Sequence, residues 1–437
     1  MNVTPSPPRC SGHPHPEWIG ATAWSADDAV FHREFRHETL RRFAKFRTHG
    51  NAPPNLQIAL RSLTGLDPLF LLPALLDIEG DMKQTKTTRQ LAHLLLERLG
   101  RAAPSAAPST TGNAWLPAEH PLDYDWRFTD DTRARLADTI GRVGTEPVLL
   151  LGCPTLALDS SIGSLRRTLV DDNPALATSE LAPTLTHMRQ DLIADPGCTA
   201  GLEATTAVGD PPFYPDAMTA YAYAAASGVR VGGKLHFVVP NRWARPSAAR
   251  DVAHLIDTAT TFGLTLTRQD ADGARYRTPK FERAAYARSG YAGVPDEWRT
   301  ADILTFTLIS PCSLPPPLLH SDRGNWGEVS AGGLRWRINA SSATVTSAPD
   351  LLGEERLLTT VSRRDPRRAG ANVFTDDNRA YRSPNPVLLA HTLHALAEDG
   401  DAVLDGVARR VGAPLTPHQK GAVQSTIARI RSPNLPS

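Results

Sequence analysis

Short apolar runs that alternate with stretches of helix-forming composition make up the middle of this chain. Five runs come first, namely EPVLLLGCP, SLRRTLVDDNP, DLIADPG, TTAVGDPPFYP and GGKLHFVVPN, and the helical stretches between them are 155–164, 174–190 and 215–228. This alternation is typical of a parallel sheet with helices on both faces. A helix at 246–262 and two strands at 263–269 and 301–310 follow, the strands as a terminal β-hairpin. The pattern therefore predicts a mostly parallel α/β domain from about Glu146 to Leu308.

Helical periodicity dominates the residues before this domain. Aromatic residues recur every three or four positions over 28–50 and predict a helix there, and further helices are expected at 55–63, 67–77, 86–99 and 130–143. The other face of the first helix carries arginines from Arg33 to Arg47. That face either binds nucleic acid or phosphate or is an ordinary solvated face, which is the commoner case.

Proline-rich stretches and a change of pattern divide the rest of the chain. Residues 1–17 read as a disordered tail, and 101–114 and 311–318 read as linkers. After the second linker, alternating polar and apolar residues predict short antiparallel strands, followed by helices at 386–398 and 416–431. We therefore expect four parts: the tail (1–17), a helical module with its linker (18–114), the α/β domain (115–318) and a C-terminal α+β module (319–437).

Composition narrows the class of protein. The 437 residues carry 47 basic and 46 acidic side chains, so no strong overall field points to nucleic acid or an anionic membrane. The four cysteines lie far apart without zinc-binding spacing, no apolar run reaches the ~20 residues of a membrane span, and the N-terminus lacks a signal peptide, so we expect a cytoplasmic protein without a metal. Serine hydrolase, zincin and P-loop motifs are absent. The many proline, alanine and arginine residues are typical of a high-GC bacterial gene.

The strongest chemical signal is Asp210-Pro211-Pro212-Phe213, followed by Tyr214, at the end of a predicted central strand. In parallel α/β sheets, ligands bind beyond the carboxyl ends of the strands. The Asp210 carboxylate and a carbonyl of the rigid diproline turn can each accept an N–H from an amine. Phe213 or Tyr214 can stack on a planar base or close over a cation. These residues are the candidate catalytic group.

Three earlier strand ends supply candidate cofactor-binding residues. Gly152, Cys153 and Pro154 form the turn after the first strand, where a glycine permits close backbone approach to a ligand. Asp171 or Asp172 ends the second strand and can accept hydrogen bonds from ribose hydroxyls, and Asp195 ends the predicted third strand. Helix capping or turn formation would explain each aspartate separately, and a small buried side chain under the turn would explain Cys153.

The DPPF tetrapeptide after a strand resembles the motif of the amino-group class of S-adenosylmethionine-dependent methyltransferases, which have a Rossmann-like fold. The resemblance implies an S-adenosylmethionine donor over Gly152, Asp171/Asp172 and Asp195, with an amine acceptor beside Asp210. The acceptor is left open as a small molecule, a protein amine or a nucleobase in DNA or RNA. One departure concerns the first turn, which is usually glycine-rich and here has only Gly152.

The layout from Asp123 to Leu308 is also similar to the branched-chain polyamine synthases. That resemblance implies aminopropyl transfer from decarboxylated S-adenosylmethionine to a polyamine. Those enzymes carry an acidic run after the first-turn glycine, where this chain has Cys153-Pro154-Thr155. A third hypothesis is a catalytically silent scaffold that binds nucleic acid through Arg33–Arg47 and Arg363–Arg382, and a homodimer is also left open.

Two other segments have ambiguous patterns. Asn241 and Arg242 after the fifth strand either face the pocket or belong to a solvated loop, which we favour. Residues 275–291 mix arginines with Tyr276, Phe281 and other aromatic residues, which suits either base stacking or an amphipathic edge helix.

Overall fold

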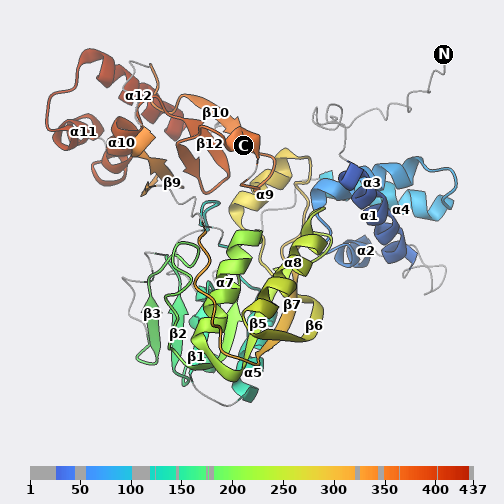
Figure 1. Ribbon diagram of the computed structural model, residues 1–437. Helices are drawn as coiled ribbons and strands as arrows, with labels where there is room; N and C mark the ends of the chain where they lie inside the picture. The colour runs from blue at the N-terminus through green and yellow to red at the C-terminus, as the bar shows by residue number, and fades with distance from the viewer. Residues whose placement is uncertain are drawn as a thin grey trace.

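The computed structural model describes residues 26–44, 56–100, 119–123, 125–143, 147–173, 176, 182–319, 325–342, 349–363, 365–400 and 402–432. The expected tail (1–17) and first linker (101–114) lie outside these residues. Figure 1 shows a central α/β domain with a helical module on one side and an α+β module on the other. Within the described residues, no helix is both long and apolar enough to cross a bilayer.

The central domain is built on a seven-stranded sheet in the order β3-β2-β1-β4-β5-β7-β6. β1 to β5 run parallel, and β7 is antiparallel to both β5 and β6. The mostly parallel Rossmann-like sheet with a terminal hairpin is therefore confirmed. The strands are β1 (Val148–Leu151), β2 (Arg167–Val170), β3 (Leu185–Met188), β4 (Ala204–Gly209), β5 (Val229–Pro240), β6 (Leu264–Arg275) and β7 (Thr300–Leu308).

Strand order reverses between β1 and β4, because β2 and β3 extend from β1 in one direction whereas β4 and β5 extend in the other. Such a switch point leaves a crevice at the carboxyl ends of the two strands, where α/β proteins bind ligands. The residues at those two ends are Gly152 and Asp210.

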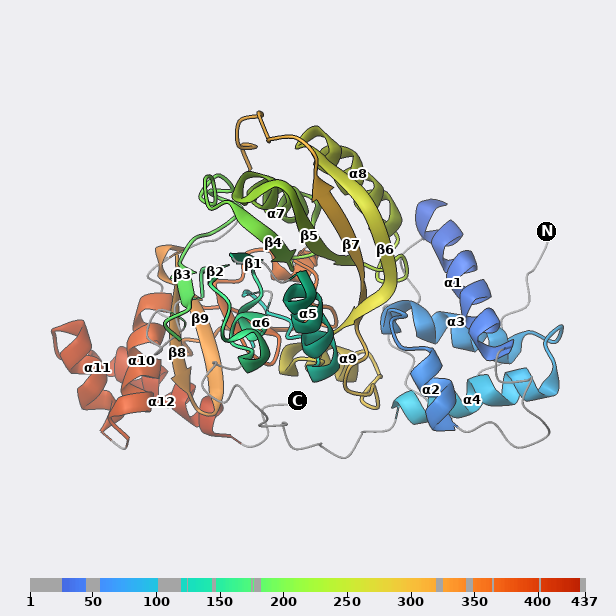
Figure 2. The same ribbon diagram turned by 90° about the horizontal axis from the view of Figure 1, so that it is seen from below.

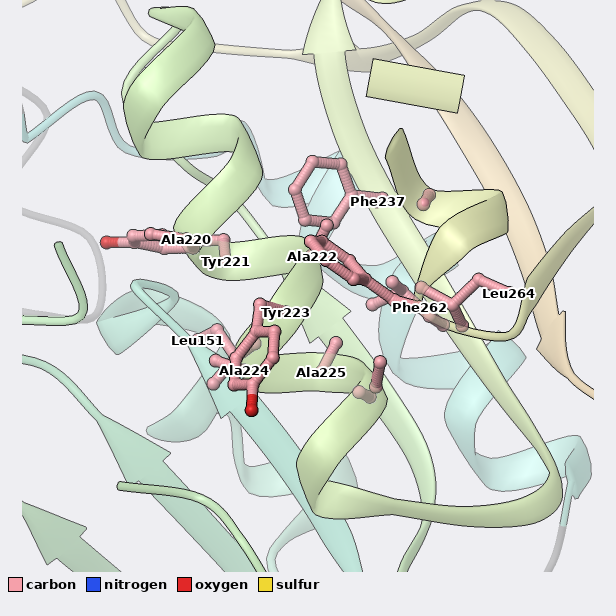
Figure 3. Close-up of a cluster of buried hydrophobic side chains, with 14 of the residues drawn as sticks. Leu151, Ala220, Tyr221, Ala222, Tyr223, Ala224, Ala225, Phe237, Phe262 and Leu264 are labelled. Carbon is pink, nitrogen blue, oxygen red and sulfur yellow. The ribbon is translucent and has the colours of Figure 1, made fainter. Parts of the chain in front are cut away.

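Helices cover both faces of the sheet (Figure 2). One face carries α7 (Pro215–Gly228) and α8 (Ala248–Thr261), and the other carries α5 (Asp130–Val143) and the single turn α6 (Pro154–Ala157), which is followed by a 3₁₀ turn at Ser160–Ile162. The predicted bounds of α5 and α7 are confirmed. α7 can lie close to the sheet because its buried face is mostly alanine, and it packs with Leu151 and Phe237 of the strands beneath it (Figure 3).

The third strand differs from the prediction. β3 is Leu185–Met188, within a stretch expected to be helical, whereas the residues around Asp195 form turns. The prediction that DLIADPG is the third strand, with Asp195 at its end, is therefore wrong. β3 is only four residues long and lies at the sheet edge, where one partner strand leaves its outer residues partly exposed, so its apolar signal is weak.

The N-terminal module consists of α1 (Ala26–Ala44), α2 (Leu56–Ser62), α3 (Pro68–Gly80) and α4 (Lys86–Gly100). Its core is continuous with Trp298 and Tyr291 of the central domain. The amide of Asn241 is buried and donates to Gly65 O at 3.1 Å and to Thr300 Oγ1 at 2.8 Å. Asn241 thus fixes this module to the sheet and has neither of the roles weighed for it from the sequence.

The C-terminal module has a five-stranded sheet in the order β10-β12-β11-β9-β8 with three helices. The predicted helix 386–398 is confirmed, and its cap Asn385 accepts from Leu388 N at 3.0 Å. Its elements are β8 (Trp326–Ala331), β9 (Leu334–Asn339), β10 (Glu354–Leu357), β11 (Val373–Thr375), β12 (Arg379–Arg382), α10 (Pro386–Glu398), α11 (Val403–Val411) and α12 (Pro417–Arg431). The α+β prediction for this region is therefore confirmed. The remaining helix, α9 (Lys280–Arg288), lies between β6 and β7 and faces this module.

Candidate active site

A cavity of about 990 Å³ opens at the switch point of the central sheet. Residues from the N-terminal module, the central domain and the C-terminal module line it. Asp67 and Phe70 come from the N-terminal module, the strand ends supply the floor, and Trp326, Glu328 and Thr360 come from the C-terminal module. In Figure 1 the two outer modules lie at the same end of the sheet, so that together they wall the crevice.

Gly152 and Asp210 lie next to each other in this cavity. The Asp210 N–H donates to Leu151 O at 3.0 Å, which ties the end of β4 to the end of β1. Gly152 has φ +66°, and a Cβ at this position would lie 2.9 Å from the Tyr221 ring and 3.1 Å from Asp210 O. Only glycine fits there without a clash, so the single glycine of the first turn has a steric reason.

Asp210 is a partly buried carboxyl group, and one of its oxygens has a fixed partner. The Tyr276 hydroxyl donates to its Oδ1 at 2.5 Å, and Tyr276 itself is stacked on Phe128 with 5.2 Å between ring centroids. Burial raises the pKa of Asp210 well above its ordinary value, although the Tyr276 hydrogen bond opposes the shift. A carboxyl group that binds a proton this readily is suited to accept one from an amine.

The other residues of the DPPF-Tyr segment also line the cavity. The Pro212 carbonyl accepts from Tyr214 N at 2.7 Å, so the Pro211 carbonyl is the better candidate to receive a ligand N–H. Phe213 meets the Tyr276 ring edge-on at 6.2 Å. The guanidinium of Arg363 lies 4.0 Å from the centre of the Tyr214 ring, which puts an arginine where a cation was expected to stack.

A second acidic group, Asp125, lies beside Asp210 in the cavity lining. Burial raises the pKa of Asp125. The charge of Arg127, which donates to Asp125 at 3.0 Å, opposes this shift. The negative charge of Asp125 in turn adds to the raised pKa of Asp210. Trp126 forms the neighbouring wall, held by a 2.9 Å bond to the buried Glu282. This side of the cavity thus combines two carboxyl groups with an aromatic face.

The expected cofactor-binding residues divide into two groups. Gly152, Pro154, Asp171 and Asp172 line the cavity, whereas Cys153 and Asp195 are not among the described residues that do. The Cys153 thiol is buried, donates to Leu151 O at 3.3 Å, and has its pKa raised well above the ordinary value by burial. Cys153 is therefore the small buried residue under the turn that the sequence offered as the alternative to a ligand contact.

Asp171 lies close to the Gly152 turn, because the N–H of Gly152 donates to the carbonyl of the preceding residue, Val170, at 3.0 Å. The charge of Asp171 contributes, after burial and the charge of Asp210, to the raised pKa of Cys153. One of its oxygens accepts from Asn173 N at 2.8 Å and shapes the loop after β2. In the stretch after β3, Asp191 lines the cavity in the place expected for Asp195, together with Arg189 and Gln190.

The sequence did not single out several residues that line the cavity. Tyr276 was visible only as one of several aromatic residues in 275–291. Asp125 was visible only as a residue near the start of the stretch from Asp123 to Leu308 that resembles the branched-chain polyamine synthases. Tyr221 lies on the inner face of an alanine-rich helix, where a tyrosine is an ordinary core residue. The wall formed by the C-terminal module gives no signal in the sequence, because it depends on how the modules pack.

The two arginine-rich segments form many contacts within the chain. In the first, Arg36 bonds Asp81 at 2.5 Å and Arg42 bonds Glu38 at 2.8 Å. In the second, Arg363 bonds Asp216 at 2.8 Å and Arg379 bonds Asp377 at 2.8 Å. These pairs favour a structural role for the arginines concerned, and nucleic-acid binding stays a prediction.

No model of a known protein family matches this chain, and no curated protein sequence matches it. Among solved structures, it is similar to the branched-chain polyamine synthase C9 mutein from Thermus thermophilus in complex with N4-aminopropylspermidine and 5'-methylthioadenosine. The match has 14% identity and a TM-score of 0.47, covering 68% of this chain and 97% of the other.

Two methyltransferase structures are also similar. The N-methyltransferase NodS from Bradyrhizobium japonicum, in complex with S-adenosyl-l-homocysteine, has 13% identity and a TM-score of 0.28, covering 49% of this chain and 97% of its own. The 16S rRNA N2 G1207 methyltransferase from T. thermophilus, in complex with AdoMet and guanosine, has 14% identity and a TM-score of 0.28. The match covers 58% of this chain and 57% of the other. Both groups that the sequence resembles thus occur among the similar structures.

Proposed function

We propose that this protein is an S-adenosylmethionine-dependent transferase that moves a methyl group to an amine nitrogen. One observation carries the proposal: Gly152 and Asp210, from strands on either side of the switch point, border one cavity and are tied by the 3.0 Å bond from Asp210 N to Leu151 O. A donor at the glycine turn and an acceptor at the carboxyl group would therefore lie within reaction distance.

On the donor side, we assign the ribose hydroxyls to Asp171. It is the first residue after β2 and follows Val170, whose carbonyl accepts from Gly152 N at 3.0 Å, whereas Asp172 is one residue further from the turn. The close approach of the donor depends on the absence of a side chain at Gly152. We assign the base of the donor to the stretch 189–192, which lines the adjoining wall.

On the acceptor side, Asp210 orients the amine and receives its proton. Tyr276 occupies Oδ1 of Asp210, so Oδ2 can accept the N–H of the acceptor while the Pro211 carbonyl accepts another. The nitrogen lone pair forms the new N–C bond as the C–S bond of the donor breaks, and its electron pair stays on sulfur, which becomes a neutral thioether. The positively charged nitrogen product then loses a proton to Asp210 or to water.

Calorimetry with S-adenosylmethionine and S-adenosylhomocysteine tests donor binding directly. We expect both to bind the wild-type protein. If neither releases heat with the folded protein, the proposal fails. Acceptor classes can then be compared by mass spectrometry of spermidine, glycine and adenosine incubated with donor and protein, which represent an aliphatic polyamine, an amino acid and a nucleobase amine.

Aminopropyl transfer from decarboxylated S-adenosylmethionine is the second candidate. The segment 153–155 lacks acidic residues, yet Asp67, Asp125 and Glu328 line the cavity from elsewhere in the chain. Carboxylates in these places could receive the ammonium groups of a polyamine. Calorimetry with both donors separates the cases, because an aminopropyltransferase should prefer the decarboxylated donor.

A further inference from the structure

Arg363 of the C-terminal module contacts Tyr214, which follows the DPPF motif, and Asp216. Its backbone N–H donates to the Tyr214 hydroxyl at 3.1 Å, and its guanidinium lies 4.0 Å from the centre of the Tyr214 ring. The same guanidinium donates to both carboxylate oxygens of Asp216 at 2.8 Å. Tyr214 is the residue that directly precedes α7, and Asp216 lies in the first turn of that helix.

Three contacts to one arginine exceed what is needed to dock one module on another. An ordinary interdomain ion pair would require only the bond to Asp216. Here a hydrogen bond and a cation–π contact also fix the hydroxyl and the ring of Tyr214, a residue of the cavity lining beside Asp210. The charge of Arg363 lowers the pKa of Asp216 below its ordinary value, although burial acts in the opposite direction.

The segment that carries Arg363 is itself firmly held. Ser289, which directly follows α9, donates to Thr359 O at 3.0 Å. Asn378 donates to Thr360 O at 3.2 Å, and Arg368 donates to Val361 O at 3.1 Å. Side chains from both the central domain and the C-terminal module therefore fix the backbone just before Arg363. Residues 360–362 of this segment also line the cavity. A side chain supported in this way can fix the position of the group that it contacts.

We infer that Arg363 is a positioning residue that holds Tyr214 against the acceptor, so that the C-terminal module completes the acceptor half of the site. This inference rests on the proposed function. Arg363 itself does not react; it acts through the aromatic ring that follows the DPPF motif. Loss of Arg363 should let the Tyr214 ring change orientation, and the main consequence should be weaker acceptor binding while the donor half is unaffected.

The test uses the full-length protein labelled with 3-fluorotyrosine. The protein has eight tyrosines, and each contributes a ¹⁹F signal. The Tyr214 signal is assigned by its loss in Tyr214→Phe. Arg363→Ala should shift and broaden this signal, and Arg363→Lys should restore part of the shift because lysine keeps the charge. Arg410→Ala is the matched control. Arg410 lies on α11, bonds Asp399 at 2.7 Å and is outside the described cavity lining. The exposed fraction of its side chain is 23%, against 19% for Arg363. An unchanged Tyr214 signal in Arg363→Ala overturns the inference.

Asp216→Asn provides a second route if Arg363→Ala does not fold, because it loosens Arg363 from the opposite side and should shift the same signal. With whichever of spermidine, glycine or adenosine the wild-type protein methylates, Arg363→Ala should raise the acceptor KM about tenfold or more with a smaller change in kcat. The affinity for S-adenosylhomocysteine should not change. An unchanged acceptor KM also overturns the inference. If the wild-type protein binds no donor, the proposed function fails, whereas the ¹⁹F comparison still shows whether Arg363 holds Tyr214.

Discussion

The Tyr276 hydroxyl and the Asp210 carboxylate form a 2.5 Å hydrogen bond inside the cavity. The two residues are 66 positions apart in the chain and come from the ends of two strands that are not neighbours in the sheet. Since the bond favours the ionised form of Asp210 while burial opposes it, the pair sets how readily this carboxyl group exchanges a proton.

Replacing Tyr276 with phenylalanine should impair catalysis through Asp210. Without the donated hydrogen bond, the pKa of Asp210 rises further, so a smaller fraction of the Asp210 carboxyl groups is ionised at neutral pH. A hydrogen bond to a charged group is worth roughly 1.5–3 kcal/mol, which corresponds to about one to two pH units. The acidic limb of the kcat/KM profile should therefore move to higher pH by that amount. Tyr223→Phe is the control, since Tyr223 donates to Leu314 O at 2.9 Å and is not among the described residues that line the cavity. Identical profiles for both variants and the wild type would contradict this role.

Asp210→Asn should gain stability relative to the wild-type protein as the pH increases. The folded-state pKa of Asp210 lies above the ordinary value of 3.8, so below pH 3.8 the group is protonated in both the folded and unfolded states and has no effect. As the pH rises toward the folded-state pKa, only the unfolded state ionises, and the wild-type protein loses stability. Asparagine removes this loss and can still accept from Tyr276. Thermal unfolding of both proteins without ligand, from about pH 4 to pH 8, should show a Tm difference that widens with pH. A constant difference across the range argues against a raised pKa. In turnover assays the same variant should be inactive.

Gly152→Ala should abolish donor binding. The added Cβ would lie 2.9 Å from the Tyr221 ring and 3.1 Å from Asp210 O, which narrows the turn that the donor must approach. Gly201→Ala is a matched control, because Gly201 also has a positive φ (+81°) but no atom within 4 Å of the added Cβ. Both variants should lose about 1 kcal/mol of unfolding free energy from backbone strain. Gly152→Ala should lose more, because its Cβ also presses on Tyr221 and Asp210 O. Only Gly152→Ala should lose calorimetric affinity for S-adenosylhomocysteine, by tenfold or more; equal affinity in the two variants would remove the glycine turn from the donor site.

Asp171→Asn should weaken donor binding without unfolding the loop. Asparagine can still accept from Asn173 N, the bond that shapes this turn, but it lacks the charge that strengthens hydrogen bonds to ribose hydroxyls. A loss of roughly 1.5–3 kcal/mol corresponds to a tenfold to hundredfold rise in the Kd for S-adenosylhomocysteine. Asp195→Asn should leave the Kd unchanged, since Asp195 is outside the described cavity lining. The assignment of Asp171 fails if the two variants bind the ligand equally well.

The amino-acid sequence alone determined the central sheet and one side of its site. The runs that form β1, β2, β4 and β5 are apolar because they are largely buried on both faces of the sheet. Because each run is continuous and apolar, the strand and the residue at which it ends can be recognised in the sequence. For the same reason Gly152, Asp171 and Asp210 could be placed at strand ends and expected in one crevice. The edge strand β3 was missed, and Asp195 was misplaced with it, because four partly exposed residues carry little periodic signal.

The tertiary structure decided what closes the crevice. Tyr276 and Asp125 reach the same cavity, and Arg363 contacts Tyr214 in its lining. These residues come from segments that are separated by long stretches of chain, and each would be an unremarkable surface or core residue by local pattern. Their roles depend on how the hairpin, the lead-in segment and the C-terminal module pack around the sheet. Hydrophobic periodicity encodes which face of an element is buried, but not which distant polar group it will meet there.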